Sequence, residues 1–474
     1  MTSKDFKSHL IDKFPFKPTD SQKNAILSIV DFLFSIQTDS IYILKGYAGT
    51  GKSTLIGYLV TQISNITYRS VLMAPTGRAA KVISNYSNRT AYTIHKQIYF
   101  SKAESGGVIK FVLKPNKRKK TLFIIDEASM ISDESHNSKL FENGSLLDDL
   151  IQYVDSGNQC KLILVGDPAQ LPPVHFNTSP ALDKNHLISK FNKEVIEWQL
   201  EEVVRQEKDS SILINATKIR ECINIDNYND FTFSINHDQE LIRLQEGNEI
   251  LEALDSSLQG SGISETVLIV RSNKRANQYN QQIRSRILFL DSELSVGDQL
   301  MVVKNNYFWL SPDSLPGFIA NGDLISILKI ISYHDLYKLN FVKVEVQLVD
   351  YPSEKPFETV LLVNTLISEN PALSYEESNN FYNEIQKDYT NITSKYKRFL
   401  ATKSNPYFNA LQVKYSYSIT CHKSQGGQWK NVFIEYPYLP EGPNKEYFRW
   451  LYTGITRAEN KLYLIGFPNE QFNL

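Results

Sequence analysis

The segment GYAGTGKS at residues 46–53 restricts the fold of this chain more than any other feature. It matches the pattern G-x-x-x-x-G-K-[ST] in full, and it lies between an apolar run, IYILK, and a helical pattern, STLIGYLVTQI. In such a loop, backbone N–H groups and the N-terminus of the next helix close around phosphate groups. The sequence therefore predicts a strand, a phosphate loop and a helix in an α/β domain that binds a nucleotide.

Further short apolar runs extend this pattern into a parallel sheet. The runs at 41–45, 70–74, 121–125 and 161–165 are continuously apolar, as expected of strands buried on both faces, and helical patterns separate them. A similar rhythm returns at 267–270, 416–420, 431–435 and 461–465, which predicts a second α/β domain. Between the two parts of that domain, β-rich runs and a polar helical tract predict a small inserted β-barrel with a helical extension.

Bulk properties exclude several classes of protein. The 51 basic and 52 acidic side chains nearly cancel, so any basic surface must be local. The three cysteines, Cys160, Cys222 and Cys421, have no metal-ligand spacing and predict no disulfide framework, which fits a reducing cytoplasm. The polar N-terminus lacks a signal peptide's apolar core, and no apolar run approaches the ~20 residues that span a bilayer, so no membrane partner is expected.

The phosphate loop and a pair of carboxylates predict ATP and Mg²⁺ as cofactors. Lys52 is expected to bridge the β- and γ-phosphates, and the Ser53 hydroxyl to bind Mg²⁺. Asp126 and Glu127 end the strand at 121–125, where a carboxylate faces the nucleotide crevice. Asp126 is expected to be a second Mg²⁺ ligand, and Glu127 is expected to be the general base that orients the attacking water. The remaining residues expected to bind the nucleotide around the loop are Gly46, Ala48, Gly49, Thr50, Gly51 and Thr54.

The next strand leads into GDPAQLPPV at 166–174, which predicts a tight turn at the strand end. Gln170 then lies one crossover from Asp126 and Glu127, where its amide is expected to touch the γ-phosphate. The alternative is a loop that the prolines merely stiffen.

Eight blocks in a fixed order give the chain a specific resemblance. They are GYAGTGKS, APTGRAAK (74–81), TIH (93–95), IIDEASM (124–130), GDPAQLPPV, VVRQ (203–206), ITCHKSQGGQW (419–429) and LYTGITRA (451–458). In this set the chain resembles the superfamily-one, type B helicases, and within them the RecD-like and Dda-like group. The resemblance extends from about residue 18 to about residue 466.

The resemblance implies a fold with four parts. The first part is a RecA-like P-loop NTPase domain (1–200), and the second is a β-hairpin pin inserted in it at about 97–120. The third is another RecA-like domain (201–297 and 406–474), and the fourth is a Src-homology-three-like barrel insert (298–405) with its helical extension. Nucleotide is expected between the two RecA-like domains, with single-stranded DNA across the top of both.

Further nucleotide residues follow from the same resemblance. Arg205 and Arg457 match the arginines that the second domain adds to the phosphates, and a guanidinium suits that role because it is always charged and forks onto oxygens. Gln22 matches the glutamine that reads adenine. Gly426 and Gln428 match the block that approaches the nucleotide, although such families usually carry Glu where Gln428 stands.

The expected nucleic-acid track has a part in each domain. Its residues are Pro75, Thr76, Arg78, Thr93 and His95 in the first domain, and Asn273, Thr420, His422, Lys423, Ser424 and Gln425 in the second. Hydroxyl, amide and charged groups of this kind contact phosphate and sugar.

Two β-prone runs around Ser-Gly-Gly within residues 96–120 predict the hairpin that corresponds to the pin. Tyr99 and Phe100 are candidates for stacking on a base. Two alternatives remain open here: these aromatics pack the hairpin onto its domain, and the basic cluster at 117–120 is a solvated loop end rather than a phosphate contact.

The function predicted from the sequence is an ATP-dependent DNA helicase. It is expected to act as a monomeric motor on single-stranded and forked DNA, and the resemblance implies 5′-to-3′ movement. Two alternatives are an RNA-acting helicase of the same superfamily and a DNA-stimulated ATPase subunit that does not unwind. Phosphate and stacking contacts leave the first alternative open, because only contacts to the 2′-hydroxyl distinguish RNA from DNA.

Overall fold

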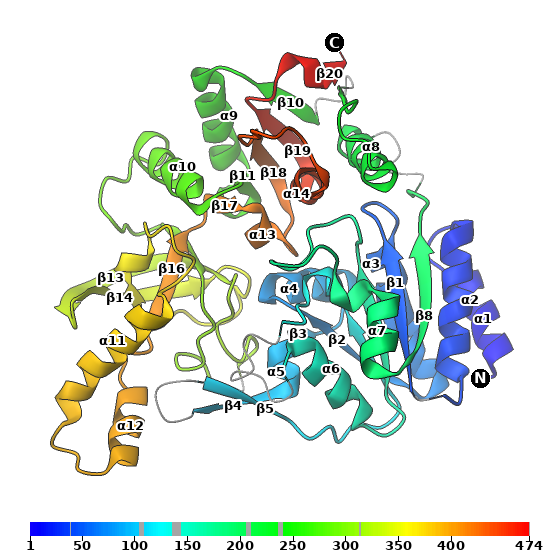
Figure 1. Ribbon diagram of the computed structural model, residues 1–474, viewed down its shortest axis with the longest axis horizontal. Coiled ribbons are helices and arrows are strands. Elements are labelled where there is room, and N and C mark those ends of the chain that lie inside the picture. Colours follow the sequence, from blue (N-terminus) through cyan, green and yellow to red (C-terminus); the bar gives the residue numbers. More distant parts are fainter. Residues whose placement is uncertain are drawn as a thin grey trace.

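The computed structural model describes residues 1–37, 39–103, 109–134, 144–204, 210–235, 240–311 and 314–473, with backbone alone at 101–103, 109–111 and 473. Figure 1 shows three bodies around a common junction: one sheet domain with the N-terminus, one with the C-terminus, and a barrel with two projecting helices. Two α/β domains and an inserted barrel confirm the predicted fold class.

The first domain contains six parallel strands in the order β3-β2-β6-β7-β1-β8. Strands β1 (Ser40–Gly46), β2 (Arg69–Ala74), β6 (Thr121–Ile125) and β7 (Lys161–Gly166) confirm the four predicted strands, and β3 (Ala91–Thr93) and β8 (Glu194–Leu200) form the edges. The helices of this domain are α1 (Ser3–Asp12), α2 (Asp20–Phe34), α3 (Lys52–Gln62), α4 (Gly77–Ser87), α5 (Ile94–Ile98), α6 (Leu146–Asp155) and α7 (Lys184–Phe191).

Apolar side chains cover both faces of this sheet, which explains why its strands read as continuous apolar runs. Tyr42 and Leu44 of β1 pack on one face with residues of α2 and α3. Ile41 and Ile43 of the same strand point the other way and pack with residues of α6 and α7. The carboxyl ends of the strands are left at one edge of the sheet, and the phosphate loop lies there.

The second domain contains five parallel strands in the order β10-β19-β18-β11-β17. Strands β11 (Thr266–Val270), β17 (Ser418–Thr420), β18 (Trp429–Glu435) and β19 (Ala458–Ile465) correspond to the predicted runs, and β10 (Leu241–Leu244) was not predicted. Its helices are α8 (Ser211–Ile225), α9 (Gly247–Gly260), α10 (Asn273–Arg286), α13 (Cys421–Ser424) and α14 (Lys445–Ile455). A short pair, β9 (Phe233–Ser234) and β20 (Phe472–Asn473), lies beside it.

The barrel is closed by β12 (Gln299–Val302), β13 (Leu324–Leu336), β14 (Leu339–Leu348), β15 (Phe357–Leu362) and β16 (Leu411–Tyr415). Because β16 is needed to close it, the barrel extends beyond the predicted boundary at residue 405. The boundary was missed because the strand runs almost directly into the second domain. Helices α11 (Tyr375–Gln386) and α12 (Lys395–Lys403) form the expected extension, and Phe381 and Ile385 of α11 pack on the barrel.

The predicted hairpin is present as β4 (Tyr99–Ala103) and β5 (Ile109–Leu113), an antiparallel pair that projects from the first domain. The Ser-Gly-Gly tip lies outside the described residues. Among the described helices, none has the length and apolar character that crossing a membrane requires.

Candidate active site and nucleic-acid surface

The phosphate loop closes between β1 and α3. Gly49 and Gly51 have φ angles of +72° and +77°, a left-handed conformation that favours glycine. The Lys52 ammonium donates hydrogen bonds to the carbonyl oxygens of Gly46, at 2.6 Å, and Tyr47, at 2.8 Å. The charge of Lys52 therefore lies within the loop, where it was expected to meet phosphate.

Gln22 is buried and holds the loop from behind. Its amide nitrogen donates to the carbonyl oxygen of Thr50 at 3.0 Å, and its amide oxygen accepts from the Thr19 N–H at 3.0 Å. The structure thus shows Gln22 fixing the loop, and its expected role in reading adenine stays a prediction.

The two carboxylates follow β6 as predicted. Burial and, next to it, the Glu127 charge raise the pKa of Asp126 to about 7, although the hydrogen bond from the Glu127 N–H and the Lys52 charge act in the opposite direction. Glu127 has a φ of +52°, an uncommon conformation for a residue with a side chain, and its N–H donates to Asp126 at 2.9 Å. Strained backbone of this kind is typical of functional sites, because the surrounding fold must hold it in place.

Ser53 and Asp126 fit a Mg²⁺ site by their chemistry. A hydroxyl and a carboxylate are the oxygen ligands that this cation prefers. Burial and the charges of Asp126 and Glu127 raise the pKa of Tyr86 of α4, and a hydrogen bond with Ser53 lowers it. Ser53 and the two carboxylates therefore lie near the same tyrosine, at a point beside the phosphate loop.

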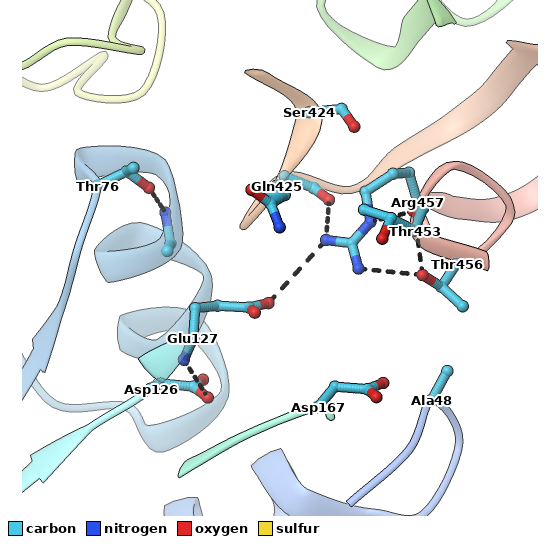
Figure 2. A network of polar contacts seen from close by, with 12 residues as sticks. Ala48, Thr76, Asp126, Glu127, Asp167, Ser424, Gln425, Thr453, Thr456 and Arg457 are labelled. Carbon is cyan, nitrogen blue, oxygen red and sulfur yellow. Dashed lines mark hydrogen bonds and ion pairs between the residues drawn. The ribbon is translucent and has the colours of Figure 1, made fainter. Parts of the chain in front are cut away.

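Arg457 reaches this point from the second domain. Its guanidinium lies 4.0 Å from the Glu127 carboxylate (Figure 2), and the residue is only 4% exposed. Three groups of its own domain hold it: the Thr453 carbonyl at 2.9 Å, the Thr456 hydroxyl at 3.1 Å and the Gly427 carbonyl at 3.2 Å. The arginine is therefore fixed and aimed across the cleft.

The second predicted arginine, Arg205, lies outside the described residues. The chain just before it meets the phosphate loop, because the Val204 N–H donates to the Gly49 carbonyl at 2.9 Å.

The loop that follows β7 joins the two domains. The Leu171 N–H donates to the Thr453 hydroxyl at 2.8 Å, and the Gln425 amide donates to the Leu171 carbonyl at 2.7 Å. Gln170 is 6% exposed, and its buried amide oxygen has no partner among the described residues. It lines a cavity of about 390 Å³ together with Ser129 and Asp167. Contact with a γ-phosphate remains a prediction for Gln170.

Gly426 and Gln428 approach the first domain at α4 rather than at the phosphate loop. Gly426 has a φ of +71°, and a Cβ atom there would lie 2.8 Å from that of Ala79. The Gln428 carbonyl accepts from Arg78, and its side chain lines a second cavity, of about 350 Å³, with Arg78 and Lys81. Their close approach thus serves contact between domains, which sequence spacing could not distinguish from contact with nucleotide.

In the first domain, Pro75 and Thr76 lie between β2 and α4, and Thr93 is the last residue of β3, directly before α5. The hydroxyls of Thr76 and Thr93 each accept a backbone N–H, from Ala79 and Lys96, and so cap the two helices. A hydroxyl that accepts in this way can still donate to a phosphate oxygen. Burial lowers the pKa of the neighbouring His95 to about 4, so this imidazole is neutral near pH 7 and does not add charge to the track.

Arg78 and Tyr99 differ from the prediction. The Arg78 guanidinium lies 3.8 Å from the centre of the Trp429 ring and donates to the Gln428 carbonyl at 3.1 Å, so it joins the domains instead of facing DNA. Tyr99 is buried, and its hydroxyl donates to Asp149 at 2.7 Å, so the packing alternative holds for this ring. Phe100 points outward and is 57% exposed.

In the second domain, Asn273, Thr420 and Lys423 line one small pocket with Lys414, a residue that the sequence reasoning missed. Burial and the Lys414 charge lower the pKa of Lys423 to about 8. His422 is exposed nearby. The cluster is polar and basic, as a phosphate contact requires. No motif marked Lys414, because it lies on β16, just before the block ITCHKSQGGQW begins.

Ser424 and Gln425 do not belong to this pocket. Both are buried: the Ser424 hydroxyl donates to the Cys421 carbonyl at 2.8 Å, and Gln425 binds Leu171. The short helix α13 turns their side chains away from the surface that presents His422.

Two family models match the chain, an AAA domain over residues 19–230 and a UvrD-like helicase C-terminal domain over residues 415–465. The ATP-dependent DNA helicase Dda of Enterobacteria phage T4 is 24% identical, over 94% of this chain and 99% of its own length. The chain belongs to the superfamily-one helicases. Within them this helicase is similar to Dda, and its reaction class is ATP hydrolysis.

Two further similarities add less. An uncharacterized protein of Methanocaldococcus jannaschii is 26% identical over 95% of this helicase, which spans only 38% of that protein's length. Among solved structures, a Pif1 helicase from Bacteroides in complex with ADP-AlF3 and ssDNA is 15% identical, with a TM-score of 0.49, over 96% of this helicase and 94% of that chain. A structural similarity this weak has no bearing on the reaction.

Proposed function

We propose that this helicase is an ATP-driven motor that moves 5′-to-3′ along single-stranded DNA and separates duplex at the hairpin β4–β5. The observation that carries the proposal is the position of Arg457, which lies 4.0 Å from Glu127 although the two residues belong to different domains. An arginine so placed can stabilise charge on the transferred phosphate only while the domains are together.

The nucleotide chemistry is divided between the two sides of the cleft. Lys52 and the loop amides hold the phosphates, and Glu127 orients the attacking water. Ser53 and Asp126 would hold Mg²⁺, which offsets negative charge on the phosphates. Arg457 adds a fixed positive charge from the second domain, and we assign the same task to Arg205. Where such arginines complete a phosphoryl-transfer site, they increase its rate by about 10³–10⁵.

Hydrolysis is coupled to movement because the contacts of Arg457 and Lys52 with the γ-phosphate also hold the two domains together. Loss of the γ-phosphate removes the group that Arg457 and Lys52 share, so the cleft opens after each cycle. The two parts of the DNA track lie on different domains, around Thr76 and around Thr420. Opening and closing therefore change the spacing of the grips and move the protein along the strand.

Support for DNA as the partner comes from both surfaces and from one relative. The N-termini of α4 and α5 offer backbone N–H groups, and Lys423 with Asn273 offers a cation and an amide. The phage relative is named a DNA helicase. The 5′-to-3′ direction rests on the resemblance alone. We further propose a monomeric, cytoplasmic protein.

Separating base pairs needs a rigid wedge as well as a pull, because each stacked step is worth about 1.4 kcal/mol. The hairpin is suited to this because Tyr99 anchors its base in the domain core, while the neighbouring Phe100 is exposed. An exposed aromatic ring can stack on the terminal base pair.

The test uses labelled forks with only a 5′ tail or only a 3′ tail, in DNA and RNA versions, with ATP and Mg²⁺. We expect strand release from the 5′-tailed DNA fork. The variant Lys52→Ala should bind single-stranded DNA normally but neither hydrolyse ATP nor release strands. Release from the 3′-tailed fork alone would contradict the direction. Release from RNA but not DNA would favour the RNA motor, and DNA-stimulated hydrolysis without release would favour the regulatory ATPase.

A further inference from the structure

The hydroxyl of Tyr452 connects helix α14 to two loops of the first domain. Tyr452 belongs to α14 of the second domain, and its hydroxyl accepts a hydrogen bond from the Ala48 N–H of the phosphate loop at 2.9 Å. The same hydroxyl donates to the Asp167 carboxylate at 2.7 Å. Asp167 is 1% exposed and also accepts the Ala169 N–H at 2.9 Å, so it is itself fixed.

The next residue of α14, Thr453, also binds the helix to the first domain. The Thr453 hydroxyl accepts from the Leu171 N–H at 2.8 Å and donates to the Arg449 carbonyl at 2.7 Å. The phosphate loop also enters the second domain's apolar core through Tyr47, with the Arg220 guanidinium 4.3 Å from its ring. The end of α14 is therefore docked on the first domain at several points.

That docked helix end carries Arg457. The Arg457 guanidinium donates to the Thr453 carbonyl and to the Thr456 hydroxyl, and Thr456 in turn donates to the Tyr452 carbonyl, both from its N–H at 3.0 Å and from its hydroxyl at 2.9 Å. Figure 2 shows this group around Arg457, with Ala48 and Asp167 on the facing domain. Tyr452 thus links the two ends: its hydroxyl binds Ala48 and Asp167, and its backbone carbonyl binds Thr456, which in turn binds the guanidinium beside Glu127.

We propose that Tyr452 is a positioning residue for Arg457: its hydroxyl docks the end of α14 against the phosphate loop and so determines where the guanidinium meets the phosphate. The inference rests on the proposed function, since it assigns Arg457 to the phosphoryl-transfer step. Tyr452 does not touch the reacting atoms. It acts by fixing the helix that carries the arginine.

The chemistry of the contact suits this role. The tyrosine is fully buried, and this burial together with the Asp167 charge raises its pKa well above the ordinary value, so the phenol stays protonated and can donate. Its oxygen remains able to accept from Ala48. Phenylalanine keeps the ring and its packing but can make neither hydrogen bond.

The same helix supplies a matched control. Tyr447 is also 1% exposed, and its hydroxyl has no hydrogen-bond partner among the described residues. Tyr447→Phe therefore removes a buried hydroxyl from α14 without touching the docking contact. Thr453→Val is an independent second variant, because it removes the bonds of the Thr453 hydroxyl to Leu171 and Arg449 but leaves both contacts of the Tyr452 hydroxyl in place.

The experiment measures kcat and KM for ATP hydrolysis with saturating single-stranded DNA in wild type, Tyr452→Phe, Thr453→Val, Tyr447→Phe, Arg457→Ala and the double variant Tyr452→Phe/Arg457→Ala. We expect Tyr452→Phe to lower kcat about tenfold or more, the scale of one lost hydrogen bond to a charged group, with KM within about threefold. Thr453→Val should act in the same direction, and Tyr447→Phe should stay within about twofold of wild type.

The double variant decides between positioning and general damage. If Tyr452 acts through Arg457, adding Tyr452→Phe to Arg457→Ala should change kcat less than about twofold. Multiplication of the two effects, or a Tyr452→Phe enzyme equal to the Tyr447→Phe control, would overturn the inference. A failure of the proposed function is distinct, since wild type itself would then show no hydrolysis-dependent strand release.

Discussion

The guanidinium of Arg457 lies 4.0 Å from the carboxylate of Glu127, and the two residues come from different domains. Arg457 is held by three hydrogen bonds. Glu127 follows Asp126 at the end of β6 and has a strained backbone conformation. Neither position can shift without disturbing its own domain. The pair therefore makes hydrolysis depend on how the two domains are placed, which leads to the first prediction.

Removing the Arg457 side chain should nearly stop hydrolysis. We expect Arg457→Ala to lower kcat for ATP by about 10³-fold, because no other described side chain of the second domain reaches Glu127 at this distance. Arg271→Gln is the control, since Arg271 forms an exposed ion pair with Glu446 in the same domain. A steady-state ATPase assay compares them, and equal losses in both variants would refute the assignment.

A methyl group at Gly426 should force the domains apart. The φ of +71° already disfavours a side chain, and the added Cβ would lie 2.8 Å from that of Ala79. Gly442 is the matched control, because its φ is +78° but nothing lies within 4 Å of an added Cβ. We expect Gly426→Ala to lower kcat at least about tenfold while Gly442→Ala costs only about 1 kcal/mol of stability, measured by urea unfolding.

Substitutions of the two aromatic residues at the hairpin base should have different effects. Phe100→Ala should reduce strand release several-fold without changing DNA-stimulated hydrolysis or stability, because that ring is 57% exposed. Tyr99→Phe should instead lower the free energy of unfolding by about 1–3 kcal/mol, because Asp149 loses a buried donor. Fork unwinding and urea titration measure the two quantities. Loss of stability in Phe100→Ala would argue against a role for this ring at the fork.

Arg78 provides a test of where its charge acts. A phosphate contact would contribute to the salt dependence of DNA binding, with a slope change of about one per cation lost. Because Arg78 lies over Trp429, we expect Arg78→Gln to leave that slope unchanged and to lower kcat for ATP several-fold. Lys423→Gln is the comparison that should reduce the slope. Binding isotherms at four salt concentrations measure it, and a reduced slope in Arg78→Gln would restore the DNA contact predicted from sequence.

Asp323 should make stability depend on pH. It is 2% exposed, and burial, with a smaller effect of the Asp350 charge, raises its pKa from 3.8 to about 7. The folded protein then holds a proton on Asp323 that the unfolded chain releases. The stability that this proton contributes is fully present below pH 3.8 and is lost as the pH rises through about 7.

We therefore expect wild type to lose roughly 1.4 kcal/mol of unfolding free energy relative to Asp323→Asn for each pH unit within that window. Urea unfolding at about pH 5, 6 and 7 measures this difference. The exposed carboxyl variant Asp335→Asn should follow wild type in parallel. If the gap between wild type and Asp323→Asn stays constant over these pH values, Asp323 does not titrate there.

Many of the helices and strands, and their order, could be predicted from the amino-acid sequence. Continuous apolar runs identified the strands buried on both faces, and GYAGTGKS with Asp126-Glu127 located the nucleotide site, because these patterns depend on short-range spacing along one chain. The inserted barrel was also predictable, although β16 lay past its expected end. The backbone conformation of a local motif depends on neighbouring residues, so it can be predicted without the rest of the fold.

The direction in which the side chains of each block face follows from the packing of the folded domains. Arg78, Gln425 and Gly426 were expected at a ligand and instead join the domains, and Lys414 entered the second-domain pocket without any motif. Tyr452 occurs in the block LYTGITRA, yet its partners, Ala48 and Asp167, are about 400 and 285 residues away. Such contacts are determined by how separate domains pack, and no periodicity along the chain records that packing.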